Sequence, residues 1–149
     1  MSTLVETNIL TRSIYQADPL HTLAVDAVDV LRQKGEQLCL VPQNYYEFWV
    51  VCTRPVQQNG LGMTPAQVQT EITQLERLFA LLDEVPDIFP EWKRLVTQYQ
   101  VIGKNAHDAR LVAAMNVHKV ASILTLNVQD FQRYAGIVVL SPQQLVGKP

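Results

Sequence analysis

The chain has 149 residues, of which 48% are hydrophobic and 17% are charged, and this balance fits a single globular domain over residues 1–149. Its formal net charge of −2 argues against a protein that coats nucleic acid by bulk electrostatics, so any polynucleotide contact would be regional. No segment approaches the ~18 apolar residues of a membrane span and no secretory signal pattern is evident, so we expect a cytoplasmic protein without membrane contact. Cys39 and Cys52 lack metal-ligand spacing and are expected to be buried thiols.

Short apolar runs alternate with stretches of helical spacing along the chain. In chain order the predicted elements are a strand over 3–5, a helix over 18–34, a strand over 37–41, helices over 43–54, 64–82, 92–102 and 105–116, a strand over 120–126, a short helix around 130–131 and a strand over 137–140. Because parallel strands need helical crossovers, this alternation predicts an α/β fold. We expect a mostly parallel β-sheet flanked by helices on both faces, in a Rossmann-like three-layer α/β/α arrangement.

Three of the predicted helices have recognisable start signals. Asp18 precedes Pro19, which suits an N-cap followed by proline at the first helical position. Thr64 begins a capping box that ends at Gln67. Asn105 is placed to cap the helix that follows it.

Acidic and amide side chains follow the ends of the predicted strands. Glu6 follows the first strand, Glu47 lies shortly beyond the second, and Asn127 follows the strand over 120–126. Asp108 lies in the first turn of a predicted helix. In open parallel sheets, ligands bind beyond the carboxyl ends of the strands, so we expect these side chains to lie close together there. Oxygen donors of this kind suit hard divalent cations.

Five segments of the chain resemble the PIN-domain ribonucleases, in particular the small VapC-like toxins. The likeness spans nearly the whole chain and rests on ETNIL near the start, PQNYYE, GKNAHDARLVAAM, ILTLNVQDFQRY and GIVVLSP. The resemblance implies a PIN-like fold and one or two Mg²⁺ or Mn²⁺ ions. These ions would be held by Glu6, Glu47, Asp108 and either Asn127 or Asp130. The polar neighbours that would support the ligands are Thr7, Asn8 and Thr125.

The resemblance also implies a reaction and partners. A bound metal ion lowers the pKa of an attacking water, so RNA phosphodiester bonds would be hydrolysed without a side-chain nucleophile. The chain offers no Ser/His/Asp or Cys/His arrangement that would supply one. The protein would be an endoribonuclease acting on structured RNA and the toxin of a type II toxin–antitoxin system. Its partners would be a second copy of itself and a cognate antitoxin protein.

Glu6 departs from the pattern of these ribonucleases, whose first acidic position is normally aspartate. The extra methylene adds more than ~1 Å of reach, against a tolerance of ~0.5 Å for a catalytic constellation. We therefore expect reduced or metal-selective catalysis, because glutamate is still an anionic oxygen ligand. A second interpretation is a catalytically weak PIN-like module that binds RNA or a protein. A third is a phosphohydrolase of small phosphate esters, which should carry an early nucleophilic aspartate.

Each candidate residue also has a purely structural interpretation. Acids favour helix N-termini, so Asp108 suits the helix dipole, and Asp130 suits a capping role as well as ligation. Glu6 taken alone is a charge at a strand end. The cations that flank the acidic segments are candidates for contacts to an RNA backbone, or else charges at solvated helix ends. They are Arg12, Lys104, Arg110 and Arg133.

Overall fold

Five short strands pair in parallel in the computed structural model, which describes residues 1–147. They are β1 (Ser2–Val5), β2 (Gln37–Leu40), β3 (Ala80–Leu81), β4 (Ser122–Leu124) and β5 (Val138–Leu140). Their order across the sheet is β3-β2-β1-β4-β5, and each neighbouring pair is parallel. The predicted α/β class with a parallel sheet is therefore confirmed.

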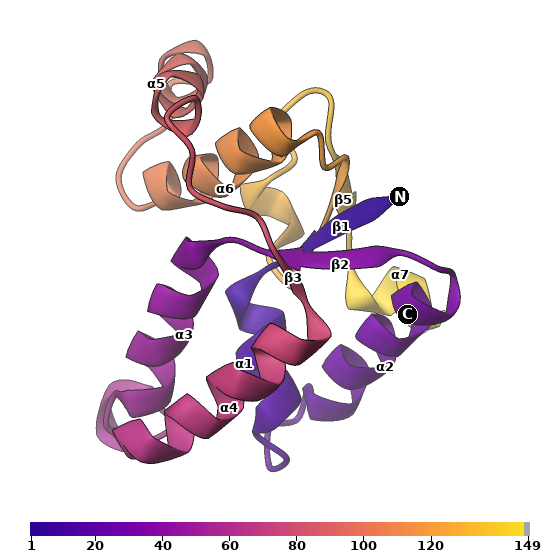
Figure 1. The fold of residues 1–149 in the computed structure, drawn as a ribbon, viewed down its shortest axis with the longest axis vertical. Coiled ribbons are helices and arrows are strands. Elements are labelled where there is room, and N and C mark those ends of the chain that lie inside the picture. Colours follow the sequence, from indigo (N-terminus) through magenta and orange to yellow (C-terminus); the bar gives the residue numbers. More distant parts are fainter. Residues whose placement is uncertain (148–149) are drawn as a thin grey trace.

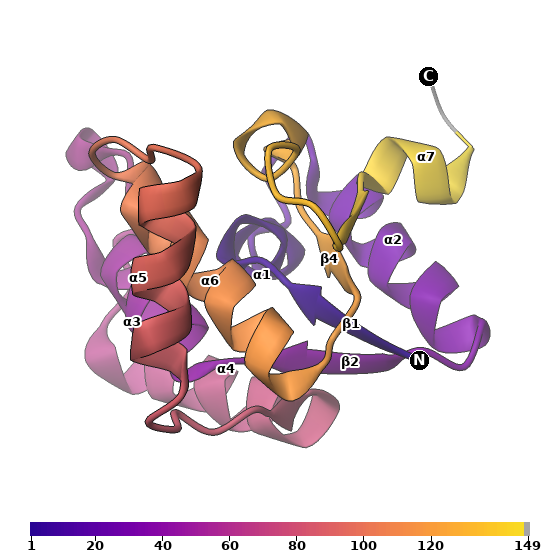
Figure 2. The ribbon, with the colours of Figure 1, turned by 90° about the horizontal axis from the view of Figure 1, so that it is seen from above.

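Helices cover both faces of this sheet (Figures 1 and 2). The α-helices are α1 (Thr7–Ile14), α2 (His21–Gln33), α3 (Pro42–Thr53), α4 (Pro65–Leu78), α5 (Ile88–Gln98), α6 (Asn105–His118) and α7 (Pro142–Val146). Helices α5 and α6 lie on one side of the sheet, and α1 to α4 with α7 lie on the other (Figure 1). Short 3₁₀ turns cover Val56–Gln58 and Val128–Asp130.

Two apolar clusters, one on each face of the sheet, hold the layers together. Because side chains alternate along a strand, Leu4 packs with α5 and α6, whereas Val5 packs with α1, α2 and α3. Ile123 and Leu124 divide in the same way between the two clusters. Both cysteines are buried free thiols, as expected. Across residues 1–147, no helix has the length and apolar character needed to cross a bilayer.

Two elements differ from the sequence-based prediction in the middle of the chain. The helix predicted over 64–82 ends at Leu78, because Phe79 is already extended, with φ −126° and ψ 142°. The next residues form the edge strand β3, and Leu82 donates a backbone hydrogen bond of 2.8 Å to Leu40. Phe79 and Leu82, on either side of this strand, continue the helical spacing of apolar residues, so periodicity alone could not locate the change.

Two predicted caps are also wrong. Asp18 accepts a 2.8 Å hydrogen bond from the backbone of Leu20, but the helix begins only at His21, so Asp18 stabilises the preceding turn. Asn105 is the first residue of α6, and its N-cap is Lys104, which has no side-chain capping bond. Helices α1 and α7 were not predicted. The strand predicted over 120–126 is shorter, at Ser122–Leu124.

The strand order creates a switch point between β1 and β4. From β1 the chain builds β2 and then β3 on one side, and it later adds β4 and β5 on the other side. Crossovers therefore leave in opposite directions at the carboxyl ends of β1 and β4, which is the place where open α/β sheets bind their ligands. Glu6 and Thr125 directly follow these two strand ends.

Candidate functional site

Glu6 occupies the switch point between β1 and β4. Its backbone N–H donates to the carbonyl of Leu124 at 3.0 Å, which extends the sheet by one more bond. Its side chain accepts a hydrogen bond at Oε2 from the Thr125 hydroxyl, at 3.2 Å. Glu6 is only 7% exposed and Thr125 is fully buried. The first acidic candidate is thus held inside the fold by the end of a neighbouring strand.

Glu47 projects from α3, the helix that follows β2, and two side chains fix its carboxylate. The Thr7 hydroxyl donates to Oε1 at 2.9 Å, and the Gln43 amide donates to Oε2 at 3.1 Å. Thr7 in turn accepts a bond of 3.2 Å from Asn44, whose own oxygen accepts from the backbone of Val41. This chain of bonds sets the position of α3 relative to α1.

Gln43 also connects α3 to the helix that carries Asp108. The same amide nitrogen that holds Glu47 donates to the backbone carbonyl of His107 at 2.9 Å. Asp108 is the next residue, half-buried in the first turn of α6. One buried amide therefore sets the first turn of α6 against the Glu47 carboxylate.

The carboxylates influence one another's ionisation. Burial, and then the charge of Asp108, raises the pKa of Glu6 from 4.5 to about 8, with smaller contributions from Glu47 and Asp130 and an opposing one from the Thr125 hydrogen bond. Burial, Asp130 and Glu47 likewise raise the pKa of Asp108 from 3.8 to about 6, against opposing effects of His107 and Arg133. Like charges raise a pKa in this way when the groups lie close together without a cation between them. Of the predicted set, Glu6, Glu47, Asp108 and Asp130 thus form one electrostatic cluster, the acidic cluster, and Asn127 has no part in these effects.

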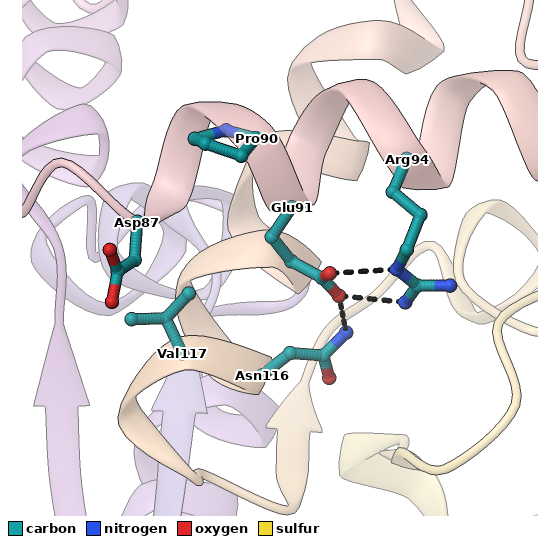
Figure 3. Close-up of a pocket in the computed structure, with 6 residues that line it drawn as sticks. All are labelled: Asp87, Pro90, Glu91, Arg94, Asn116 and Val117. Atoms are coloured by element: carbon teal, nitrogen blue, oxygen red, sulfur yellow. Dashed lines mark hydrogen bonds and ion pairs between the residues drawn. The ribbon is translucent and has the colours of Figure 1, made fainter.

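Glu91, a carboxylate outside the acidic cluster, is instead paired with a cation (Figure 3). Glu91 lines a cavity of about 540 Å³ between α5 and α6, where it accepts hydrogen bonds from Arg94 at 2.8 Å and from Asn116 at 2.7 Å. These bonds lower its pKa below the ordinary value of 4.5. Asn116 lies two turns beyond Asp108, about 12 Å along α6, so this cavity is separate from the acidic cluster. Arg94 therefore compensates the negative charge of Glu91, whereas burial and neighbouring acids raise the pKa values of Glu6 and Asp108.

The donor chemistry of the acidic cluster fits a hard divalent cation. Its candidate ligands are carboxylate and amide oxygens, which Mg²⁺ and Mn²⁺ prefer, and a bound cation would offset both the burial and the neighbouring negative charges that raise the two pKa values. Within residues 1–147, no group of three or more His, Cys, Asp or Glu side chains already has the spacing of a metal site. A cation would therefore have to draw the carboxylates inward.

The other predicted polar residues differ in their hydrogen bonds, their exposure and their electrostatic effect on the acidic cluster. Asn8 accepts a long bond of 3.4 Å from the backbone of Leu126, and its buried amide nitrogen has no hydrogen-bond partner. Asn127 is exposed, and its backbone N–H donates to the Thr125 hydroxyl at 2.9 Å. Asp130 contributes to the raised pKa of both Glu6 and Asp108. Of the two candidates after β4, Asp130 therefore has the clearer electrostatic link to the other acids.

Of the four cations predicted to contact RNA, two form ion pairs with acidic side chains and two are exposed. Arg12 forms an ion pair of 2.6 Å with Asp18. Arg110 forms an ion pair of 2.8 Å with Glu84 and a weak bond of 3.4 Å to Gln43. Lys104 is exposed, and Arg133 is exposed and close enough to lower the pKa of Asp108.

Gln43 and Asn44 are functional candidates that sequence reasoning missed. Both are buried, at 6% and 0% exposure. Gln43 lies four residues before Glu47, so on a helix the two side chains share a face, and this spacing could have identified the pair. Nothing local indicates its second bond, because His107 is 64 positions away.

Comparison of the fold with solved structures gives matches over nearly the whole chain, although no protein-family model and no curated protein sequence matches it. VapBC2 from Rickettsia felis, bound to a DNA fragment from its promoter, covers 95% of this chain and 98% of its own, at 16% identity and a TM-score of 0.68. DNA-bound VapBC from Salmonella typhimurium gives the same coverage at 12% identity and a TM-score of 0.69. Mycobacterium tuberculosis VapC20, a Sarcin-Ricin loop cleaving toxin, covers 81% of this chain and 86% of its own, at 16% identity and a TM-score of 0.59. At these low identities the likeness is one of fold, and the chain has the PIN-like α/β fold of the VapC toxins.

Proposed function

We propose that this protein is an Mg²⁺- or Mn²⁺-dependent endoribonuclease. The observation that carries the proposal is electrostatic: Asp108, Glu47 and Asp130 all act on the buried Glu6 carboxylate, and Asp130 and Glu47 act on Asp108, although these four residues come from separate segments. Glu6 itself follows β1 at the switch point of the sheet. Ligand sites of open α/β sheets lie at such points. A cluster of uncompensated carboxylates there is suited to a divalent cation and to a phosphate bound through it.

In this proposal the carboxylates of Glu6, Glu47 and Asp108 hold one or two metal ions, together with Asp130 or Asn127. The metal would supply a water of lowered pKa and offset charge on the phosphoryl oxygens. The chain's own residues do the positioning: Thr125 orients Glu6, while Thr7 and Gln43 orient both oxygens of Glu47. Arg133 and Lys104, exposed beside the acids, are the cations best placed to contact an RNA backbone.

We further propose that the protein is the toxin of a toxin–antitoxin pair that acts in the cytoplasm. The support is the shared fold: VapBC2 and the Salmonella VapBC were solved as complexes bound to DNA, and VapC20 is described as a toxin that cleaves the Sarcin-Ricin loop. A cognate antitoxin protein and a homodimer are the partners that this proposal requires.

The test is cleavage of a labelled mixed RNA pool by purified protein in Mg²⁺ or Mn²⁺. Cleavage should disappear with a chelator and in Asp108→Asn, which keeps the shape of the side chain but removes its charge. Glu76→Gln, an equal loss of charge at an exposed position of α4, should cleave normally. Cleavage that persists in the chelator or in Asp108→Asn would refute the proposal.

A catalytically weak module that binds RNA or a protein is the second candidate. Two observations favour it: a pKa of about 8 leaves Glu6 largely protonated at neutral pH, and the described residues contain no preformed metal triad. RNA binding without any metal-dependent turnover, in a folded protein free of co-purified inhibitor, would establish this candidate over the ribonuclease.

A further inference from the structure

A largely apolar pocket of about 620 Å³ lies beside the acidic cluster, at the first turns of α5 and α6. Its apolar wall is formed by Val85, Pro86, Ile88, Phe89 and Trp92. Its polar edge is formed by Glu84, His107 and Arg110. The pocket has room for a flat group as large as a nucleobase, with polar atoms only at the rim.

Two aromatic rings of this pocket stack on each other, and one of them is held by a hydrogen bond. The indole nitrogen of Trp92 donates to the backbone carbonyl of Ala106 at 2.8 Å, which ties α5 to the start of α6 and locks the ring. The ring of Phe89 stacks on Trp92 at 6.0 Å between centroids, with 25° between the planes. Phe89 is nevertheless 66% exposed, so the pocket offers an aromatic ring that the fold leaves accessible.

Two residues of the pocket are neighbours of a proposed catalytic residue in α6. His107 and Arg110, which line the pocket, flank Asp108 on the first turns of α6. Gln43 contacts both of these residues and also holds Glu47, so a single side chain separates the pocket from a proposed metal ligand. An RNA strand with one phosphate at the acids would therefore bring a neighbouring base to the pocket.

The charges at the rim select a base over a phosphate. Arg110 is paired with Glu84 at 2.8 Å, so the pocket presents no unpaired guanidinium, and phosphate groups are bound chiefly by free cations and N–H donors. A neutral base instead gains from stacking on aromatic faces. We propose that the pocket is a nucleobase subsite, in which Phe89 and Trp92 stack on a base next to the cleaved phosphate. This inference rests on the proposed ribonuclease function.

RNA binding without metal tests the subsite separately from cleavage. The probe is a fluorescein-labelled single-stranded RNA of mixed sequence, about 12 nucleotides long, and its anisotropy is measured in EDTA. Phe89→Leu removes the aromatic face but keeps an apolar side chain, and it should weaken binding about 5- to 100-fold. Phe89→Tyr keeps the face and should bind normally. Leu78→Ala, at another exposed apolar position on α4, is the matched control and should also bind normally.

Tryptophan emission reports directly on the pocket. The chain has two tryptophans, so in Trp49→Phe the only emission comes from Trp92. Trp49 lies on the other face of the sheet, packed against the cluster beneath α3. Saturating RNA should quench Trp92 in this background, and adding Phe89→Leu should reduce the quenching in proportion to the lost affinity.

RNA affinity and Trp92 emission together distinguish failure of the subsite from failure of the proposed ribonuclease function. Equal RNA affinity of wild type and Phe89→Leu, or unchanged Trp92 emission at saturation, overturns the subsite, while metal-dependent cleavage would leave the ribonuclease intact. If Phe89→Leu changes the sedimentation of the protein but not its RNA affinity, the pocket is a protein contact and the subsite is again refuted. Absence of both RNA binding and cleavage refutes the subsite and the proposed function together.

Discussion

The hydroxyl of Thr125 donates to Glu6 Oε2 at 3.2 Å, between residues that are 119 positions apart in the chain. Parallel pairing of β1 with β4 makes this contact possible, because Val5 is in register with Leu124 and the next residue of each strand follows at the same edge. The bond favours the ionised form of Glu6 but is outweighed by burial and by the charge of Asp108. Glu6 is thus held in place by a hydrogen bond that does not offset the burial and the neighbouring charge that raise its pKa to about 8.

The stability of the protein should fall as pH rises, because of Glu6. Its pKa is about 8 in the folded state and near 4.5 when the chain is unfolded, so between these values the folded state holds the proton more tightly. This contribution is complete below pH 4.5 and is lost as pH rises toward 8, with a size of at most a few kcal/mol. Denaturant unfolding in EDTA from about pH 4 to about pH 9, which spans both pKa values, would measure it. Glu6→Gln should flatten this dependence, and an equal slope in the variant would contradict the assignment.

Divalent metal should restore that stability. A ligand that binds only the folded state at 100 times its Kd adds about 2.7 kcal/mol, which corresponds to a Tm increase of about 5 to 10 °C for a chain of this size. The increase with Mn²⁺ should be larger at pH 8 than at pH 5.5, since protons compete for Glu6, whose pKa is about 8, and for Asp108, whose pKa is about 6. Asp108→Asn should lose the increase, whereas Glu76→Gln should keep it. A pH-independent increase would place the metal elsewhere.

Shortening Glu6 to aspartate should change both rate and metal preference. If Glu6 places its carboxylate too far into the site, Glu6→Asp should raise the cleavage rate about tenfold and alter the ratio of Mg²⁺- to Mn²⁺-supported activity, as about 1.4 kcal/mol of transition-state stabilisation would do. The same shortening at Glu47 should lower the rate, since it would break the bonds from Thr7 at 2.9 Å and Gln43 at 3.1 Å. Unchanged rate and metal affinity in Glu6→Asp would mean that the length of this side chain is immaterial.

The gathering of the acids could be predicted from the sequence because it follows from a rule about strand ends. Once the apolar runs before Glu6, Glu47 and Asn127 are assigned to parallel strands, their carboxyl ends must meet at one edge of the sheet. Which of Asn127 and Asp130 has the stronger electrostatic link to the other acids could not be predicted in this way. It depends on the 3₁₀ turn Val128–Asp130, which leaves Asn127 exposed and lets the charge of Asp130 act on Glu6.

Elements without a local signal were missed for physical reasons. Helix α1 begins at Thr7 directly after Glu6 and has only eight residues, so its pattern is too short to distinguish from the end of a strand. Strand β3 has two residues and exists only through its pairing with β2. The helix predicted over 92–102 included Trp92 but not Phe89, whereas α5 begins at Ile88. The pocket itself was missed, because nothing in the sequence shows that α5 lies against the start of α6.

Gln43 should prove to be a positioning residue for the acidic cluster. Gln43→Met is close to it in size but leaves Glu47 Oε2 and the carbonyl of His107 without their donor, so the free energy of unfolding should fall by about 1 to 3 kcal/mol. Mn²⁺ affinity, measured by calorimetry without RNA, should fall as well, because Glu47 and the first turn of α6 are no longer tied together. Gln69→Met, the same change at an exposed position of α4, should alter neither quantity. Lower stability with unchanged Mn²⁺ affinity would show that Gln43 supports the fold alone and does not position the carboxylates.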